Sequence, residues 1–151
     1  MKEKNKLRGK KARDSGARFE LKVRKDLESK GWFVDKWNNN VDLAYEENKG
    51  EKLIVDLVNK IYGKLIPAKN KFIPGRVMML GAGFPDFVIF RPAGMSHYII
   101  YGVEVKSNGY LDPKERKKCR WLLDNNVFSK ILIAKKGKKR GEIIYEDVGL
   151  K

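Results

Sequence analysis

The sequence predicts a single α/β domain in which helices flank a mixed β-sheet. Apolar residues recur every three or four positions near residues 15–30 and 113–125, which is typical of amphipathic helices. Short runs rich in Val and Ile lie between and after these segments, which is typical of strands. A chain of 151 residues with 42% hydrophobic residues suits one such domain with one core.

The chain begins with a basic segment. Seven of the first 13 residues are Lys or Arg and one is an acid, and no apolar periodicity accompanies them. We therefore predict a flexible basic arm over residues 1–14, followed by one domain over residues 15–151. A second basic run, "KKGKKR" at 135–140, lies near the other end of the chain.

The first half of the domain is predicted to contain a helix, a strand and an insertion. The helix covers 15–30 and ends at a glycine, and "WFVDKW" at 32–37 alternates as a short strand that three asparagines end. Residues 41–79 form the insertion, with a helix near 51–62 and a strand near 76–80. The stripe of the first helix consists of Gly16, Phe19, Val23 and Leu27.

The second half predicts two strands, a helix and two further strands. The strands are expected at 86–90, 97–106, 130–136 and 142–148, and the helix at 113–125. Apolar residues on both faces of the second strand indicate a central strand that is covered on both sides. The helix start has an N-cap, an N1 proline and a capping-box acid in register, at Asp112, Pro113 and Glu115.

Net charge is the strongest global signal for function. The chain has 34 Lys and Arg against 19 Asp and Glu, a formal net charge of +15 at pH 7. Clustered positive charge favours a nucleic-acid partner, because phosphate binding releases condensed counterions. A lysine-rich surface that only aids solubility is the alternative. No base-reading motif is visible, so we expect binding led by backbone charge and DNA shape.

Other classes of protein are disfavoured. No apolar run approaches the roughly 20 residues that span a bilayer, and no apolar segment opens the chain as a signal peptide would. We therefore expect an intracellular, cytoplasmic protein with no membrane partner. The single cysteine, Cys119, excludes an internal disulfide and lies on an apolar helix stripe, which predicts a core position. "GAGFPD" lacks a strand-to-helix context, so we expect no nucleotide cofactor.

Two opposite charges lie inside the strand expected at 97–106. Buried charge is costly unless it is paired or holds a metal. Glu104 and Lys106 share one face of the strand, and Val103 and Val105 share the other. Asp86 begins the preceding strand, so it can meet Glu104 at one end of the sheet if the two strands are neighbours.

Such a constellation suits phosphodiester hydrolysis. Two carboxylates can hold a hard cation such as Mg²⁺, to which backbone carbonyls add ligands. A lysine beside them can orient the attacking water or stabilise charge on the phosphate. The alternative is a structural Glu104–Lys106 ion pair, with Asp86 only capping a turn.

These residues resemble a known family. "GFPDFVIF…YGVEVKS" is similar to the signature of the PD-(D/E)xK nuclease superfamily, with Pro85-Asp86 as the PD and Glu104-Val105-Lys106 as the ExK. "SGARFELKVRKDLESKGWFV" is similar to the opening helix and strand of archaeal Holliday junction resolvases, in which a helix glutamate joins the metal site. Glu20 matches that position.

The segment after the ExK resembles the VRR-NUC branch of the superfamily. In "EVKSNGYLDPKERKKCRWLLDNN" a loop, an L-x-P turn and a helix follow the lysine, but Glu115 stands where that branch has Gln. Any polar support from Glu115 is therefore open, and a capping-box role explains it fully. The insertion at 41–79 is also longer than the equivalent resolvase loop.

The resemblance implies a restriction-endonuclease-like fold and a Mg²⁺-dependent endonuclease, with Mn²⁺ as a substitute ion, that acts on DNA junctions, flaps or single-strand boundaries. Glu20, Asp86, Glu104 and the carbonyl of Val105 would bind the metal, and Lys106 would position the water. Glu20 also lies at the margin of the apolar stripe, where a solvated pair with Arg24 is the alternative. A non-catalytic nucleic-acid-binding module and an RNA-processing nuclease are the rival functions.

DNA contacts are expected from two basic segments, although a solvated face explains the second nearly as well. They are Lys10, Lys11 and Arg13 of the arm, and Arg116, Lys117 and Arg120 of the helix at 113–125. A homodimer is also expected, because cutting both strands of a symmetric substrate needs two like sites and the stripe at 51–62 offers apolar surface.

Overall fold

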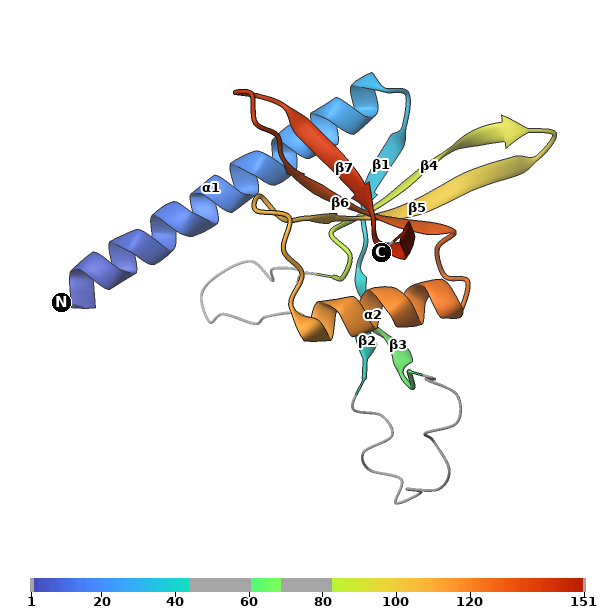
Figure 1. The fold of residues 1–151 in the computed structure, drawn as a ribbon, viewed down its shortest axis with the longest axis horizontal. Coiled ribbons are helices and arrows are strands. Elements are labelled where there is room, and N and C mark those ends of the chain that lie inside the picture. The colour runs from blue at the N-terminus through green and yellow to red at the C-terminus, as the bar shows by residue number, and fades with distance from the viewer. Residues whose placement is uncertain (1, 44–60, 69–82, 151) are drawn as a thin grey trace, which may run out of the picture.

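A computed structural model describes residues 2–43, 61–68 and 83–150 of the chain (Figure 1). In chain order its elements are α1 (Lys2–Ser29), β1 (Phe33–Lys36), β2 (Asn39–Asp42), β3 (Lys64–Pro67), β4 (Phe87–Gly94), β5 (His97–Val105), α2 (Pro113–Asp124), β6 (Lys130–Lys136), β7 (Ile143–Asp147) and the 3-10 turn η2 (Val148–Leu150).

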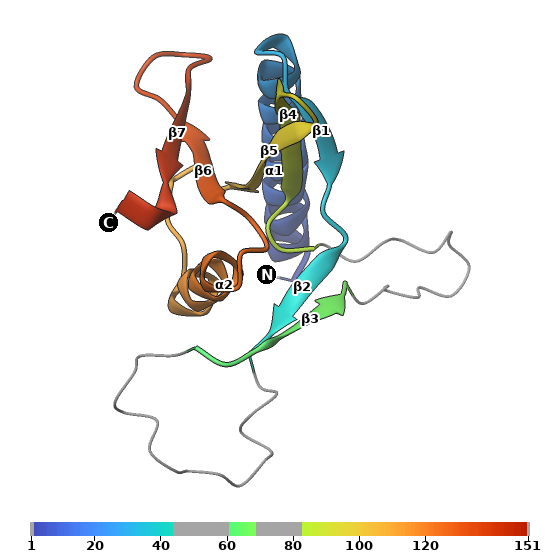
Figure 2. The same cartoon turned by 90° about the vertical axis from the view of Figure 1, so that its right-hand side faces the viewer.

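One mixed sheet has the strand order β1-β4-β5-β6-β7. Strands β5 and β6 are parallel, and the other neighbours are antiparallel. A parallel pair requires a crossover connection, which α2 provides. Figure 2 shows α2 and the separate β2–β3 pair together below this sheet. The predicted α/β class, with a mixed sheet flanked by helices, is confirmed.

Helix α1 covers one face of the sheet through the stripe that its sequence predicts. Phe19, Val23 and Leu27 are buried, and they pack with residues of β1, β4, β5 and β6. Val103 of β5 and Ala134 of β6 belong to the same cluster. Burying an apolar side chain of this size contributes about 1.5–3 kcal/mol, so the stripe anchors the second half of α1.

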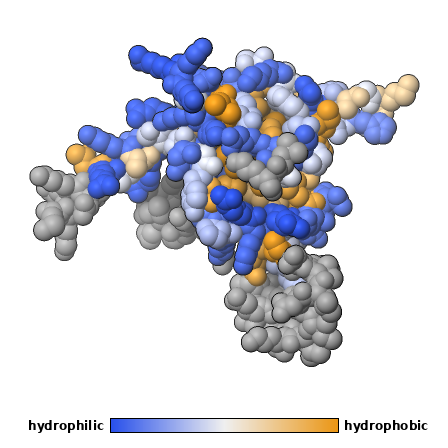
Figure 3. Space-filling view, in the orientation of Figure 1, coloured by the Kyte–Doolittle hydropathy of each residue, from blue (hydrophilic) through white to orange (hydrophobic). Residues whose placement is uncertain are grey.

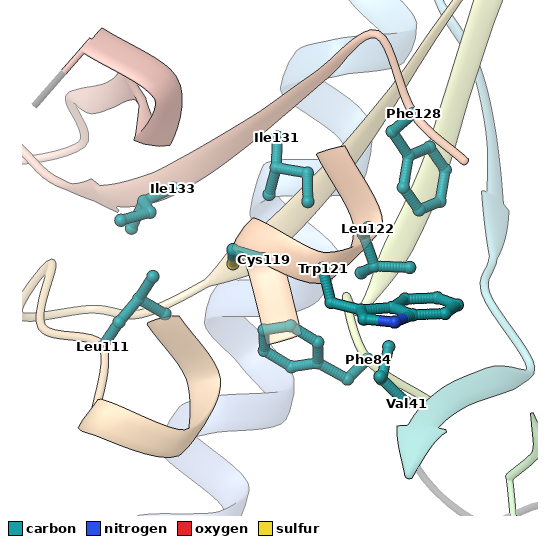
Figure 4. Packing of buried hydrophobic residues seen from close by; sticks show 9 residues of the cluster. All are labelled: Val41, Phe84, Leu111, Cys119, Trp121, Leu122, Phe128, Ile131 and Ile133. Atoms are coloured by element: carbon teal, nitrogen blue, oxygen red, sulfur yellow. The ribbon is translucent and has the colours of Figure 1, made fainter. Parts of the chain in front are cut away.

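Helix α2 covers the opposite face. Cys119, Trp121 and Leu122 are buried with Ile131 and Ile133, which alternate along β6 with the residues that face α1. Figure 4 shows this cluster around α2. The predicted core position of Cys119 is confirmed, and burial raises the pKa of its thiol to about 12, so it is no nucleophile at neutral pH.

The start of α2 is capped as its sequence predicts. Asp112 is the N-cap and its Oδ1 accepts a hydrogen bond from the Glu115 backbone N–H at 2.8 Å. Glu115 Oε2 accepts from the Asp112 backbone N–H at 3.0 Å, which completes the capping box. The chain therefore enters α2 in one fixed direction after the end of β5.

Helix α1 begins at Lys2, so the flexible arm that was predicted over residues 1–14 is helical wherever the structure describes it, from residue 2 to residue 14. The side chains of residues 7–18 are exposed, and this half of the helix projects away from the sheet (Figure 1). No apolar stripe marks the segment, which is why periodicity missed it. Lys, Arg, Ala and Glu are strong helix formers, and they extend the helix that the buried stripe anchors.

The insertion contains a strand pair that was not predicted. Strand β2 pairs with β3 in antiparallel register, although the asparagines at its start were expected to end a strand. Val41 and Leu65 join the α2-side cluster, and this burial overrides the low strand propensity of Asn. The predicted strand at 76–80, and the helix at 51–62 apart from irregular residues 61 and 62, lie outside the described ranges, as does most of the dimer surface.

Strands β4 and β5 form a hairpin that extends beyond the sheet (Figure 1). The second half of β5 is buried on both faces as predicted, but its first half is exposed, including Tyr98 and Ile100. Coverage on both sides was therefore predicted correctly for only part of the strand. Within the described ranges, no helix is both long and apolar enough to cross a membrane.

Candidate active site

The residues predicted to form the site gather at one end of the sheet. The register pairs Lys36 with Phe87 and Phe87 with Val103, so the end of β1, the start of β4 and the end of β5 are adjacent. Asp86 immediately precedes β4, and Glu104 lies one residue before the end of β5. This register supports the predicted meeting of the two carboxylates. The charge of Asp86 supports it too, because it raises the pKa of Glu104.

Asp86 is positioned by close backbone packing around the "GFPD" bend. A Cβ added to Gly83 would lie 1.7 Å from the carbonyl oxygen of Trp37, and one added to Gly102 would lie 2.8 Å from Cγ of Pro85. Both approaches therefore require glycine. The Asp86 carboxylate accepts a hydrogen bond from the Val105 backbone N–H at 2.8 Å, which ties β4 to the end of β5.

Glu104 is a buried acid with one oxygen unpaired. Its side chain is 7% exposed, and its Oε1 lies 3.2 Å from Lys106 Nζ. Among the described residues, none makes a hydrogen bond with its Oε2. Burial, together with the charge of Asp86, raises the pKa of Glu104 to about 8. Burial and the charge of Glu20 also raise the pKa of Asp86.

Lys106 lies between two carboxylates. Its Nζ donates to Glu115 Oε1 at 2.6 Å and forms an ion pair with Glu104 at 3.2 Å. Burial alone would lower the pKa of Lys106, but the hydrogen bond to Glu115 and the charge of Glu104 raise it. The ammonium therefore remains charged at neutral pH, and the predicted shared face of Glu104 and Lys106 is confirmed.

Glu115 does more than cap α2. One of its oxygens accepts from the Asp112 backbone and the other from Lys106 Nζ. Polar support from this position, which the sequence left open, is therefore present in the structure. The carboxylate orients Lys106 from the α2 side of the sheet.

Glu20 lies near the site but its carboxylate is engaged. Its Oε2 accepts from Lys36 Nζ at 2.6 Å, whereas Arg24 pairs with Glu28 and with the carbonyl of Val34. The alternative pairing of Glu20 with Arg24 is therefore wrong. Lys36 was missed by sequence reasoning, although its alternation with buried Val34 placed it on the face that meets α1.

Lys118 is a second cation that sequence reasoning missed. Its Nζ donates to Asn40 Oδ1 at 2.7 Å and lies 5.3 Å from the centroid of the Phe84 ring. Burial and the charge of Lys114 lower its pKa, and the charge of Glu104 acts in the opposite direction. The contact joins α2 to β2, which was not predicted as a strand, so no sequence signal pointed to it.

The donor set fits a hard divalent cation in part. Among the described side chains, no group of three or more His, Cys, Asp or Glu residues forms a metal-binding cluster. Asp86 and Glu104 supply two carboxylates close enough for the charge of one to act on the other, and within the described ranges Oε2 of Glu104 has no hydrogen-bond partner. A cation there would favour the charged form of both acids. Ligation by Glu20 and by the carbonyl of Val105 stays a prediction.

The predicted DNA-contact residues fall into two groups. Lys10, Lys11 and Arg13 are exposed on the projecting half of α1, and Lys117 is exposed on α2. On α2, Arg116 Nε donates to the carbonyl of Leu111 at 3.1 Å, and Arg120 pairs with Asp124 at 3.2 Å. These two arginines line a hollow that also contains Asp124, Glu146 and Asp147, so acids surround them.

Two features together define what this end of the sheet can do: two neighbouring carboxylates, Asp86 and Glu104, and a charged lysine, Lys106, that is held beside them. Such a site can bind a cation and stabilise negative charge on an oxyanion. Comparisons of the chain with protein-family models, with curated proteins and with solved structures found no match.

Proposed function

We propose that the protein is a metal-dependent endonuclease of the PD-(D/E)xK type, with a restriction-endonuclease-like fold, that hydrolyses phosphodiester bonds in DNA. The supporting observation is the juxtaposition of Asp86, Glu104 and Lys106 at one edge of the sheet, where an oxygen of buried Glu104 has no hydrogen-bond partner among the described residues. A structural ion pair alone would require neither a second, half-buried carboxylate beside Glu104 nor a Glu104 oxygen without a hydrogen-bond partner among the described residues.

Each residue has a distinct task in this proposal. Asp86 and Glu104 would hold Mg²⁺ or Mn²⁺, which would supply Lewis-acid stabilisation of the phosphate and lower the pKa of a water molecule. Lys106 Nζ orients the attacking water or stabilises the charge that develops on the phosphate oxygens. Glu115 holds Lys106 in place, so it is a positioning residue.

DNA is the proposed substrate because the chain combines this site with a net charge of +15. Backbone charge supplies affinity without reading sequence. The resemblance of the α1–β1 segment to junction resolvases supports a preference for junctions, flaps or single-strand boundaries, and action as a homodimer.

The test is a cleavage assay with Mg²⁺ on matched single strands, duplexes, flaps, four-way junctions and the corresponding RNAs. We expect Asp86→Asn to reduce cleavage at least about 100-fold, because a hard cation depends on charged oxygen ligands. DNA binding should be equal or stronger, since the change removes a negative charge near the phosphate. Lys106→Ala should also lose cleavage but retain metal binding.

The matched control is Asp14→Asn, which makes the same charge change on an exposed position of α1 and should cut at the parent rate. Melting temperatures of all variants, measured on the same preparations, separate loss of chemistry from loss of folding. Tight DNA binding without metal-dependent cleavage by the parent protein would identify the non-catalytic module. Faster cleavage of the matched RNAs would identify the RNA-processing nuclease.

A further inference from the structure

A basic groove lies between α1 and the turn that joins β6 to β7. It has a volume of about 530 Å³ and is open to solvent. Cations from both elements line it, and Phe19 is the one apolar side chain among the described lining residues. The cations are Arg18, Lys22, Lys136, Lys138, Lys139 and Arg140.

The single acid in the lining, Glu142, is used inside the turn. Its Oε2 accepts from the Lys139 backbone N–H at 3.1 Å, and its own carbonyl accepts from the Gly137 N–H at 3.0 Å. A Cβ added to Gly137 would lie 2.1 Å from that carboxylate, so a larger residue there would require the flexible Glu142 side chain to move. Among the described residues, no carboxylate forms an ion pair with the side chains that line the groove.

The groove lies at the same edge of the sheet as the candidate active site. Val105 pairs with Ala134 and Lys136 pairs with Ile143, so the β6–β7 turn leaves the sheet beside the end of β5. The backbone N–H of Lys106 donates to the Ala134 carbonyl at 3.0 Å. Neighbouring strands are about 4.8 Å apart, which places β7 roughly 10 Å from β5.

We propose that this groove binds the phosphate backbone of the nucleic acid on one side of the bond that is cut. Several cations in a hollow match a polymer with regularly spaced negative charge, and the groove opens at the same end of the sheet as the candidate site. The choice of nucleic acid as the partner rests on the proposed function.

The shape and composition of the groove favour this partner over a membrane surface. A membrane-binding surface combines basic residues with exposed apolar side chains that enter the lipid. In the groove Phe19 is buried, and Lys136 Nζ lies 5.5 Å from the centroid of its ring. Figure 3 shows hydrophilic side chains gathered over the β6–β7 turn, at the upper left of the view.

The test compares two double variants of the full chain that lose the same charge. Lys138→Ala/Arg140→Ala removes two exposed cations of the turn, whereas Lys25→Ala/Lys114→Ala removes two exposed cations from α1 and α2 outside the groove. Binding to a fluorescent DNA duplex of roughly 20 base pairs is measured by anisotropy in EDTA over a series of salt concentrations. Circular dichroism confirms that both variants melt as the parent does.

We expect the groove variant to bind about tenfold more weakly at about 100 mM salt, with a slope of log K against log salt that is smaller by about 2. The control should change affinity by less than about twofold and keep the parent slope. A groove variant that matches the control in affinity and slope overturns the proposal. Loss of binding to phosphatidylserine vesicles without loss of DNA binding also overturns it.

Cleavage assays keep this inference separate from the proposed function. If the groove variant binds DNA as the parent does while Asp86→Asn is inactive, the groove proposal is wrong and the nuclease proposal stands. If the parent cuts no substrate while the groove variant binds DNA more weakly and with a smaller salt slope, the groove proposal stands and the nuclease proposal is wrong.

Discussion

At the scale of single residues, Glu104 is the acid, among those that the structure describes, whose environment departs most from that of an exposed carboxylate. It is buried, close to the charge of Asp86, and bonded at one oxygen only. If this position served stability alone, well-packed apolar side chains in place of the buried Glu104–Lys106 ion pair would often stabilise the fold as well or better. Burial therefore favours the neutral form of Glu104 up to about pH 8, and a bound cation would be needed to favour its charged form.

This preference for the neutral form predicts a pH dependence of stability. The pKa of Glu104 rises from 4.5 to about 8 on folding, so the folded protein holds a proton that the unfolded chain has lost between about pH 4.5 and 8. The contribution of Glu104 to the free energy of unfolding is therefore complete below about pH 4.5 and is lost as the pH rises to about 8. In EDTA we expect the melting temperature to fall from pH 5 to pH 8, by an amount equivalent to a few kcal/mol in the free energy of unfolding.

The Glu104→Gln variant supplies the comparison, because its amide is neutral throughout the window and should flatten the profile. The exposed Glu28→Gln variant is the control and should keep the parent slope. Added Mg²⁺ should raise the melting temperature of the parent at pH 8 more than at pH 5. Parallel profiles for the parent and Glu104→Gln would contradict the prediction.

At the scale of elements, glycines have opposite roles in the sheet and in α1. Gly102 lies where Pro85 packs against β5, and a Cβ there would lie 2.8 Å from the proline ring. Gly16 lies in an exposed turn of α1 with no heavy atom within 4 Å of an added Cβ. The same substitution should therefore have opposite effects at the two positions.

We expect Gly102→Ala to lower the free energy of unfolding by about 1–3 kcal/mol, because the core must shift to accept one methyl group. Gly16→Ala should raise helical content and stabilise α1 by about 0.5–1 kcal/mol, because alanine loses less entropy in a helix. Urea denaturation followed by circular dichroism measures both. Equal effects of the two changes would show that the Pro85 packing does not hold the bend before Asp86.

Elements with a local signal were predictable, and elements fixed by distant contacts were not. The capping box of α2 and the alternation of Val103 and Glu104 depend on neighbouring residues, so the sequence alone predicts them. Strand β2 forms because β3 and α2 cover it, and the Glu115–Lys106 bond forms because α2 crosses back over the end of β5. Such contacts join separate elements of the chain, so they leave no periodic pattern of apolar residues from which they could be predicted.

At the scale of the whole molecule, positive charge is divided between a projecting helix and a groove. The first half of α1 lies beyond the sheet and its side chains from residue 7 to residue 18 are exposed (Figure 1). The buried stripe that anchors α1 begins only at Phe19. The described side chains of this basic half of the helix therefore add positive charge to the surface without contributing to the core.

Deletion of residues 1–13 should therefore weaken DNA binding without unfolding the domain. The deletion removes seven basic residues and one acid, so the salt dependence of binding should also become shallower. Anisotropy titrations at several salt concentrations, with thermal melts of both proteins, measure the two effects. Unchanged affinity and salt slope would assign DNA binding to other surfaces, and a large fall in melting temperature would show that this half of α1 supports the core.

Glu115 makes two contacts, so local unwinding of α2 also affects how Lys106 is held in the candidate site. Its carboxylate closes the first turn of the helix through Asp112 and holds Lys106 at the same time. A local opening that unwinds this turn therefore also breaks the Glu115–Lys106 bond and leaves Lys106 held by Glu104 alone. Amide hydrogen exchange at the start of α2 and the fraction of molecules in which Glu115 holds Lys106 are consequently linked to one opening equilibrium.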